Sequence, residues 1–321
     1  MSLASDILSG DRAALARAIT LIESTREDHQ REARDLLSQL WPKAGNSLRI
    51  GITGAPGVGK STFIEALGLH IAAQGHRLAV LAVDPSSSVT GGSILGDKTR
   101  MGKLSQQENV FIRPTAAGGT LGGVARRTRE AMLLCEASGY DVILIETVGV
   151  GQSETEVADM TDMLALLLSP GGGDELQGIK RGIVELADLL IVNKADGELA
   201  AQAKRTQADY AAALKLLHPA GRQPKVLTCS ALHGEGLGDI WKTMEEFLQR
   251  MRDSGERAHY RALQAKSWMW KEIRETLLER FLQHPRMAAE IEQAEQMVMS
   301  GSIAPSDAAA QLIRESGILP R

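Results

Sequence analysis

The spacing of apolar residues changes at about residue 47 of the chain. Before that point, apolar residues recur every three or four positions, at Leu15, Ile19 and Ile22 and again at Ala33, Leu36, Leu37 and Leu40. This spacing is typical of amphipathic helices, and Pro42 ends the second of them. We therefore predict a helical N-terminal extension over residues 1–46 that packs as a brace on the domain that follows.

From residue 47 onward, short apolar runs alternate with longer stretches of helical pattern. Seven strands are predicted, at Leu48–Thr53, Leu78–Val83, Val110–Arg113, Val142–Glu146, Leu164–Leu168, Leu189–Val192 and Val226–Thr228. Strands that alternate with helices form a mostly parallel sheet that is covered on both faces. We therefore predict an α/β domain over residues 47–253, with its ligand at the carboxyl ends of the strands.

Beyond about residue 236 the pattern contains no further strand. Its main feature is an apolar stripe at helical spacing, formed by Trp270, Ile273, Leu277, Leu278 and Phe281. We predict a helical C-terminal part over residues 254–321. Trp268 and Trp270 could face a partner, but core packing or a dimer contact is the interpretation we favour.

A glycine-rich phosphate-binding loop follows the first predicted strand. It has the pattern G-x-x-x-x-G-K-S, and its residues are Gly54, Ala55, Pro56, Gly57, Val58, Gly59, Lys60, Ser61 and Thr62. A strand before the loop and a helix after it are the context that this motif requires. Backbone N–H groups and the helix N-terminus would hold phosphates, Lys60 would reach the β- and γ-phosphates, and the Ser61 hydroxyl would bind Mg²⁺.

A second motif, Asn-Lys-Ala-Asp, follows the sixth predicted strand. The Asp196 carboxylate can accept hydrogen bonds from guanine N1–H and from the 2-amino group, which adenine lacks. The aliphatic stem of Lys194 can cover the base plane, and Asn193 can brace the loop. A loop after the last strand could offer backbone N–H groups to guanine O6; its residues are Ser230, Ala231 and Leu232. Together with the phosphate-binding loop, these residues predict a GTP/GDP site.

Two acidic residues at strand ends are candidate Mg²⁺ ligands. Asp84 follows the second predicted strand, and Glu146 ends the fourth. Carboxylates at neighbouring strand ends can hold Mg²⁺ directly or through water, although an acid in this place can also cap a helix or form a turn. Gly149, in the run Glu-Thr-Val-Gly, could donate its N–H to the γ-phosphate and so sense the loss of that phosphate.

Two longer glycine-rich segments are predicted at the rim of the site. Thr90–Lys98 contains Asp97, and Ser169–Lys180 contains three consecutive glycines and ends at Lys180. Segments of this kind suit ordering by a ligand. Without the surrounding motifs, both segments could equally well be surface linkers.

Composition and charge narrow the classes of function. The 321 residues include 36 basic and 40 acidic side chains, and the net charge of −4 does not favour binding to nucleic acid. Two cysteines without a spacing motif argue against a disulfide framework or a cysteine-based zinc site, and indicate a reducing compartment. Because no apolar run could cross a membrane and the first residues lack a signal pattern, we expect a cytoplasmic protein.

The chain resembles the MeaB/ArgK family of metallochaperone-type P-loop GTPases in five runs of sequence: GAPGVGKST, VDPSS, ETVGVGQSE, SPGGGDELQGIK and NKAD. The resemblance covers about residues 47–250 and extends to the helical additions at both ends. It implies a Rossmann-like P-loop domain, a C-terminal dimerisation arm and a homodimer. It also implies a Mg²⁺-dependent GTPase that is a chaperone of adenosylcobalamin-dependent methylmalonyl-CoA mutase, gating cofactor loading and protecting the mutase from inactivation.

The resemblance also implies roles for particular residues. Lys60, Asp97 and Glu146 would be catalytic, and Asp84 would join Asp97 and Glu146 as metal and switch acids. Lys180 would be the basic residue of an additional switch loop that reports nucleotide state to the mutase. One departure from small GTPases is Val150, which stands where those proteins often carry a water-positioning glutamine. We therefore expect slow intrinsic hydrolysis that a partner accelerates.

Three other functions compete with the chaperone interpretation. An ATPase or kinase associated with basic amino-acid (arginine or ornithine) transport would prefer ATP, which the expected guanine contact of Asp196 disfavours. A nickel-delivery GTPase would need clustered His or Cys ligands, and the seven histidines are scattered. A nucleotide-binding structural protein would act without hydrolysis. Rates with GTP and ATP, a metal titration and a hydrolysis-dead variant would separate these alternatives.

Overall fold

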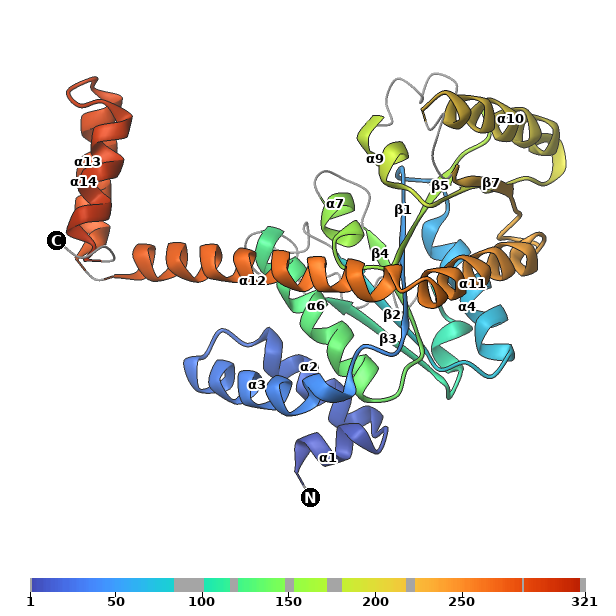
Figure 1. The fold of residues 1–321 in the computed structure, drawn as a ribbon, viewed down its shortest axis with the longest axis horizontal. Helices are drawn as coiled ribbons and strands as arrows, with labels where there is room; N and C mark the ends of the chain where they lie inside the picture. Colours follow the sequence, from blue (N-terminus) through green and yellow to red (C-terminus); the bar gives the residue numbers. More distant parts are fainter. Residues whose placement is uncertain are drawn as a thin grey trace. The chain divides into compact units, whose positions relative to one another are not determined.

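A seven-stranded parallel sheet forms the centre of the fold (Figure 1). The computed structural model describes residues 2–83, 101–115, 121–147, 153–171, 181–217, 223–284 and 286–317. The strand order is β3-β2-β4-β1-β5-β6-β7. The strands are β1 Leu48–Gly54, β2 Leu78–Val83, β3 Val110–Thr115, β4 Val142–Thr147, β5 Met163–Leu168, β6 Leu189–Val192 and β7 Lys225–Thr228. The predicted α/β fold is therefore confirmed, and each predicted strand is present to within two residues at either end.

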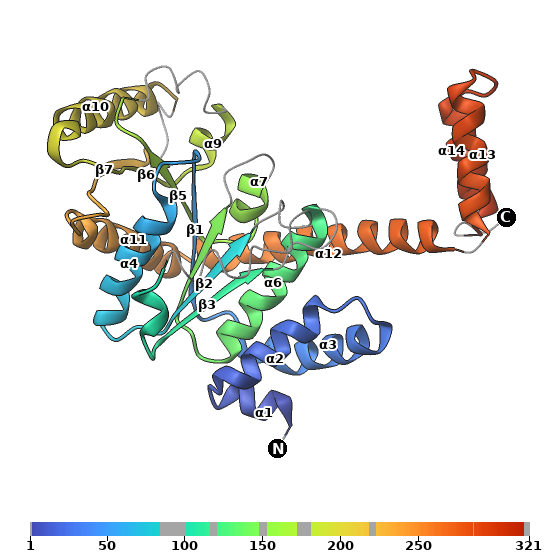
Figure 2. The same cartoon turned by 180° about the vertical axis from the view of Figure 1, so that it is seen from behind.

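Helices cover both faces of the sheet because the side chains of each buried strand alternate between the faces. Figure 2 shows α4 (Lys60–Ala73) and α11 (Leu237–Asp253) side by side on one face of the sheet. Their buried residues Phe63 and Trp241 belong to the same apolar core as Ile50 and Ile52 of β1. On the other face the helices are α6 Leu121–Ala137, α7 Ser153–Ala158, α9 Arg181–Leu186 and α10 Ala200–Leu217.

The N-terminal helices pack on α6. They are α1 Leu3–Leu8, α2 Arg12–Glu23 and α3 Glu27–Leu40, followed by the short 3-10 helix η1 Trp41–Lys43. Leu15 and Ile19 of α2 are fully buried. Arg12 donates to the backbone oxygen of Val110 in β3 at 2.7 Å. These contacts agree with the predicted brace. Two further 3-10 helices are η2 Leu104–Gln106 and η3 Gly197–Leu199.

The chain divides into two units, Met1–Arg261 and Ala262–Arg321. Helix α12 (Glu256–Gln283) begins in the first unit and continues in the second. The second unit also contains α13 (Met287–Met299) and α14 (Pro305–Glu315), which pack on each other and bury Met287 and Ala308. Among the described residues, no helix is both long and apolar enough to span a membrane.

The predicted apolar stripe lies on α12. Trp270 is 52% exposed and Leu278 is 58% exposed, and Ile273 and Leu277 are also exposed. The stripe is therefore not core within the single chain. Exposure removes the core interpretation for Trp270, and the dimer contact and the partner-facing role both stay predictions.

Candidate functional site

The loop between β1 and α4 forms the centre of the site. Gly54 ends β1, and α4 begins at Lys60. Gly57 and Gly59 have φ angles of 80° and 93°, in the left-handed region that favours glycine. A Cβ atom on Gly59 would also lie 2.8 Å from the side-chain nitrogen of Asn193. Because Gly59 occupies the N-cap position, no N-cap side chain covers the first N–H groups of α4, and these can bind an anion.

Lys60 lies folded back over this loop. Its Nζ atom donates to the backbone oxygens of Gly54 at 2.7 Å and Ala55 at 3.2 Å. Burial lowers the pKa of Lys60, while the charges of Glu146 and Glu154 oppose this shift. The ammonium group is thus held by neutral carbonyls at the position where the motif predicts phosphate.

Two oxygen groups that could bind a metal ion, the Ser61 hydroxyl and the Glu146 carboxylate, lie together next to Lys60. The Ser61 hydroxyl donates to Glu146 Oε1 at 3.2 Å, although the two residues come from α4 and β4. Glu146 is only 5% exposed. The next residue, Thr147, donates from its buried hydroxyl to the Thr53 hydroxyl at 3.0 Å, which fixes the end of β4 against β1. A hydroxyl and a carboxylate are ligands that suit Mg²⁺, so the donor set fits the predicted ion.

Several predicted site residues lie outside the described part of the chain. They are Asp84, Asp97, Gly149 and Lys180. Within the described ranges, no group of three or more His, Cys, Asp or Glu side chains could hold a metal. The structure therefore brings together two of the four predicted Mg²⁺ ligands, Ser61 and Glu146.

Asn193 joins the two halves of the predicted nucleotide site. Its side-chain N–H₂ donates to the backbone oxygen of Val58 in the phosphate-binding loop at 3.0 Å. Its side-chain oxygen accepts from the backbone N–H of Ala231 at 3.1 Å. Asn193 is 2% exposed, so both bonds are shielded from water. One buried amide therefore fixes the distance between the phosphate-binding loop, the end of β6 and the loop after β7.

Lys194 and Asp196 extend from the same turn. Lys194 has a φ angle of 58°, which is uncommon for a residue other than glycine. Its Nζ atom donates to the backbone oxygen of Gly57 at 2.8 Å. The backbone N–H of Ala195, between them, donates to the backbone oxygen of Cys229 at 2.9 Å. The turn therefore holds Lys194 against the phosphate-binding loop, and Asp196 follows two residues later in the same turn.

The remaining predicted contact residues differ in exposure. Val58, Ser230 and Ala231 are buried, Ala55 and Asp196 are intermediate, and Pro56, Gly57, Thr62 and Leu232 are exposed. Leu232 is 74% exposed, so its backbone rather than its side chain is fixed by the fold. The backbone bridge between Ser230 and Glu235 closes this loop.

Two side chains in the site are not indicated by any sequence motif. His233 Nε2 lies 3.7 Å from Asp196 Oδ2, although the two residues are far apart in sequence and the sequence alone favours a surface or capping role for His233. Cys229 is buried beside Asn193, and burial raises the pKa of its thiol to about 12, with a smaller contribution from Asp196. Only the positions of these residues, at the end of β7 and in the loop after it, could have indicated them.

The sequence of the chain matches a known protein family over most of its length. Residues 15–286 match the family described as "Methylmalonyl Co-A mutase-associated GTPase MeaB". This match covers the whole α/β domain, residues 15–46 of the predicted N-terminal extension and residues 254–286 of the predicted C-terminal part.

Individual relatives extend over nearly the same range. A protein of Caulobacter vibrioides named as a GTPase is 56% identical over 319 residues, covering 99% of this chain and 98% of its own. The mouse protein "Methylmalonic aciduria type A homolog, mitochondrial" is 52% identical, covering 96% of this chain and 77% of its own. The Escherichia coli protein "GTPase ArgK" is 50% identical, covering 84% and 82%.

A solved structure has the same fold. The crystal structure of a protein named "LAO/AO transport system kinase" superimposes with a TM-score of 0.76 at 38% identity, covering 97% of this chain and 95% of its own. With the phosphate-binding loop and the Asn-Lys-Ala-Asp turn joined through Asn193, these similarities agree with the resemblance drawn from the sequence motifs. The chain is a P-loop GTPase and belongs to the MeaB family.

Proposed function

We propose that this GTPase uses Mg²⁺ and serves adenosylcobalamin-dependent methylmalonyl-CoA mutase as a chaperone, gating cofactor loading and protecting the mutase from inactivation. The observation that carries the nucleotide part is the buried Asn193, which ties the guanine-side turn to the phosphate-binding loop. The client is supported by the description of the matching family and by the name of the mouse relative.

The residues of the phosphate-binding loop bind the phosphates in this proposal. Residues 54–62 surround the phosphate groups with backbone N–H groups, and Lys60 exchanges the carbonyls of Gly54 and Ala55 for phosphate oxygens. This exchange is favourable because a charged phosphate oxygen is a stronger hydrogen-bond acceptor than a neutral carbonyl. Bound Mg²⁺ would neutralise charge that develops on the β- and γ-phosphates.

The metal ligands and catalytic acids are part of the same proposal. Ser61 and Glu146, which already share a hydrogen bond, would hold Mg²⁺ together with Asp84 and Asp97. Lys60, Asp97 and Glu146 would act in catalysis, and Gly149 would sense the γ-phosphate. We expect slow turnover by the isolated protein, because Val150 cannot position a water molecule.

The guanine contacts are proposed for the opposite end of the site. Asp196 would accept hydrogen bonds from the base, Lys194 would cover its plane, and the backbone N–H groups of residues 230–232 would contact O6. Because Asp196 would be left unpaired by adenine, the site would select GTP over ATP.

The C-terminal part is proposed to be a dimerisation arm, with residues 47–253 as the GTPase domain and residues 1–46 as its helical extension. The exposed residues Trp270, Ile273, Leu277 and Leu278 lie on one helix and would be buried in a homodimer. Large apolar residues that gather on one face mark interaction sites more often than isolated ones do. Sedimentation of the wild-type chain and of Leu278→Glu would show a dimer and a monomer if this assignment is correct.

The chaperone role is tested by cofactor transfer. Adenosylcobalamin would be offered to apo-mutase in the presence of the chain with GTP, GDP or a non-hydrolysable GTP analogue, and loading would be followed by the absorbance of the bound cofactor. We expect loading to depend on which nucleotide is bound, and to lose that dependence in Lys60→Ala. Loading at one rate under all conditions would contradict the role.

A second candidate function is suggested by the solved relative, whose name is that of a transport system kinase. An ATPase or kinase linked to basic amino-acid transport would have to bind ATP in this site. The proposed guanine contact of Asp196 opposes that activity, because adenine would leave the carboxylate unpaired. Hydrolysis of ATP that is faster than hydrolysis of GTP would favour the second candidate.

A further inference from the structure

Helix α7 connects the predicted sensing segment to the far edge of the sheet. It begins at Ser153, a few residues after Glu146 and Thr147 at the end of β4. Its residue Val157 is fully buried against β1, where a Cβ atom on Gly51 would lie 2.7 Å from Val157 Cγ1. Val157 therefore packs directly on Gly51, and α7 has no room to move closer to β1. A displacement at the N-terminus of α7 would then be passed along the helix to its C-terminal end.

The C-terminal end of α7 contacts the first turns of α12. The hydroxyl of Tyr260 donates to the backbone oxygen of Ala158, the last residue of α7, at 3.3 Å. The next residue, Arg261, donates to both carboxylate oxygens of Asp162, with distances of 2.7 and 2.6 Å. Asp162 directly precedes β5 and also accepts from the backbone N–H of Arg49 at 3.0 Å. Tyr260 and Arg261 therefore contact both the end of α7 and the start of the central strands.

A second set of charged contacts involves helix α6. Arg129 of α6 lies 3.8 Å from Glu156 of α7, and Arg129 is only 5% exposed. Further along α6, Glu136 binds Arg49 with two hydrogen bonds of 2.8 Å. The Arg261 guanidinium lies 3.9 Å from Glu136. Helix α6 thus reaches Arg261 through Glu136 and is joined to α7 through Arg129 and Glu156. Charges interact more strongly at buried positions than in water.

The contact between the end of α7 and the first turns of α12 is not fully packed. A cavity of about 160 Å³ lies next to it, and its lining includes Ala158, Thr161, Leu186, Met251 and Tyr260. Leu186 ends α9, which also follows a predicted rim segment, Ser169–Lys180. The cavity gives the Tyr260 ring space to follow a movement of Ala158. The next residue, Arg261, is held in place by its ion pair with Asp162.

We propose that Tyr260 and Arg261 are positioning residues that link the first turns of α12 to helix α7, so that the nucleotide state sensed after Glu146 changes the stability of those turns. The inference rests on the proposed function, because it requires the segment around Gly149 to respond to the γ-phosphate. It concerns the start of α12 alone.

Amide hydrogen exchange of the full-length protein tests the link. Exchange would be compared between the GDP-bound form and the form bound to a non-hydrolysable GTP analogue. Two regions are read, the segment 147–153 and the start of α12 at residues 256–265. In the wild type we expect both regions to differ between nucleotides, with rates at the start of α12 changing by about threefold or more, the effect of one net hydrogen bond.

Variants separate the link from a general loss of structure. Tyr260→Phe removes only the hydroxyl, and we expect it to abolish the nucleotide-dependent difference at residues 256–265 while leaving the difference at 147–153 and the GDP affinity unchanged. Arg261→Lys, which keeps the charge but loses the two-pronged contact with Asp162, should reduce the same difference. Tyr210→Phe, a matched change in α10, should behave as the wild type.

The outcomes distinguish this inference from the proposed function. A response at 147–153 without any response at 256–265 in the wild type would overturn the link alone. An undiminished difference in Tyr260→Phe would also overturn it. Absence of a response at both places would refute the sensing role of the segment after Glu146 and the link together.

Discussion

At the carboxyl edge of the sheet, Lys60 lies on two backbone carbonyls, whereas at the opposite edge Arg49 and Glu136 form a buried ion pair. Lys60 is half-buried and its pKa is lowered by burial. The side chains of Arg49 and Glu136 are 5% and 0% exposed, and Ser47 also donates to Glu136 at 2.5 Å. Both edges contain buried charge, but Lys60 donates to neutral backbone carbonyls whereas Arg49 and Glu136 hydrogen-bond to each other.

The difference indicates that Lys60 serves ligand binding and that Glu136 serves the stability of the fold. Neutral carbonyls are weak acceptors for an ammonium group, so Lys60 gains when a phosphate replaces them. Glu136, by contrast, has its oxygens occupied by Arg49, Ser47 and the backbone N–H of Gly45, and no ligand could improve on these partners. A charge with interchangeable neutral partners indicates a ligand site, and a charge with a full set of fixed partners indicates a structural one.

The largest expected effect is on stability, from Glu136→Gln. The substitution leaves the buried Arg49 without its carboxylate, and breaking a buried ion pair in this way costs about 3–5 kcal/mol. Urea unfolding would measure the loss, and the GDP affinity of the folded variant should equal that of the wild type. A variant that loses GDP affinity but not stability would contradict the assignment of Glu136 to architecture.

The pH dependence of unfolding sharpens this prediction. Burial raises the pKa of Glu136, but the hydrogen bond and charge of Arg49, with Ser47 and Arg261, together lower the pKa below its ordinary value of 4.5. A carboxyl whose pKa is lower in the folded state stabilises the fold above its unfolded pKa and loses this contribution as pH falls through the folded value. The free energy of unfolding should therefore fall below pH 4.5, and less steeply in Glu136→Gln.

At the carboxyl edge, Lys60→Ala should weaken nucleotide binding strongly and change stability little, the opposite of Glu136→Gln. Losing a charged hydrogen-bond donor to phosphate should weaken GTP binding by about 100-fold, close to 3 kcal/mol. The unfolding free energy should change less than in Glu136→Gln, because Lys60 loses hydrogen bonds to neutral carbonyls and its removal leaves no buried charge without a partner. Titration calorimetry with GDP and a GTP analogue would measure the first effect, and urea unfolding the second. A variant that unfolds easily would show that Lys60 has a structural role instead.

A smaller effect is expected from Asp196→Ala. Removing the carboxylate should weaken GDP binding by about 20-fold, the effect of hydrogen bonds to a charged group, while ADP binding stays the same. Competition of GDP and ADP against a fluorescent nucleotide would measure both affinities. Equal losses for the two nucleotides would mean that Asp196 does not read the base.

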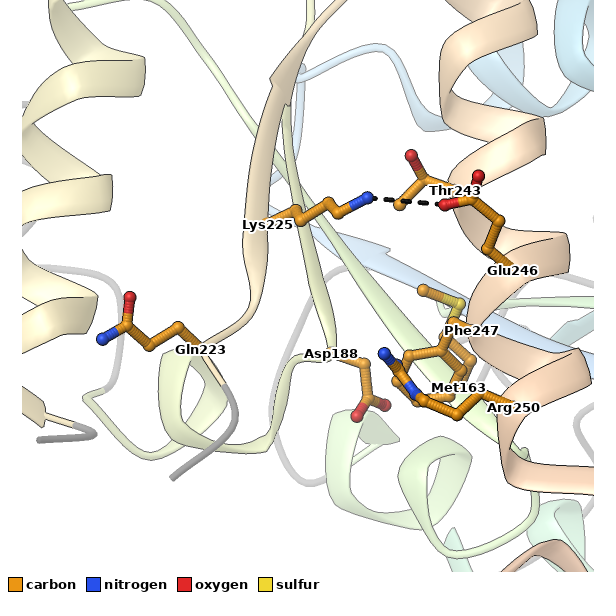
Figure 3. A pocket seen from close by; sticks show the side chains of 8 residues that line it. All are labelled: Met163, Asp188, Gln223, Lys225, Thr243, Glu246, Phe247 and Arg250. Atoms are coloured by element: carbon orange, nitrogen blue, oxygen red, sulfur yellow. Dashed lines mark ion pairs between the residues drawn. The ribbon is translucent and has the colours of Figure 1, made fainter. Parts of the chain in front are cut away.

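The smallest effect is expected from Lys225→Ala, at a surface pair. Lys225 and Glu246 lie 3.6 Å apart across a pocket that Asp188 and Arg250 also line (Figure 3), and both are more than half exposed. An exposed pair of this kind contributes at most about 1 kcal/mol. Chemical denaturation of Lys225→Ala beside Glu136→Gln would therefore compare an exposed ion pair with a buried one. A loss as large as that of Glu136→Gln would contradict the distinction by burial.

The sequence was informative where function depends on local order. The phosphate-binding loop, the Asn-Lys-Ala-Asp turn and all seven strands were predictable, because each is encoded by a contiguous run with its own spacing. The approach of Ser61 to Glu146 was also foreseeable, since both lie at carboxyl ends of strands or just beyond them.

The opposite edge was not predictable in the same way. Arg261 and Asp162 are separated by 99 positions and Arg49 and Glu136 by 87, and no motif links either pair. The approach of His233 to Asp196 also depends on how two loops fold beside each other. Contacts of this kind follow from packing of the whole domain, which single residues in a sequence do not specify.

The most direct test of the account is steady-state hydrolysis of GTP by the purified protein, with and without adenosylcobalamin-dependent methylmalonyl-CoA mutase. A MeaB-family GTPase that serves this mutase should hydrolyse GTP slowly alone and faster when the mutase is added, with ATP a poor substrate in both cases. An unchanged rate and an unchanged nucleotide affinity in the presence of the mutase would contradict the proposed client.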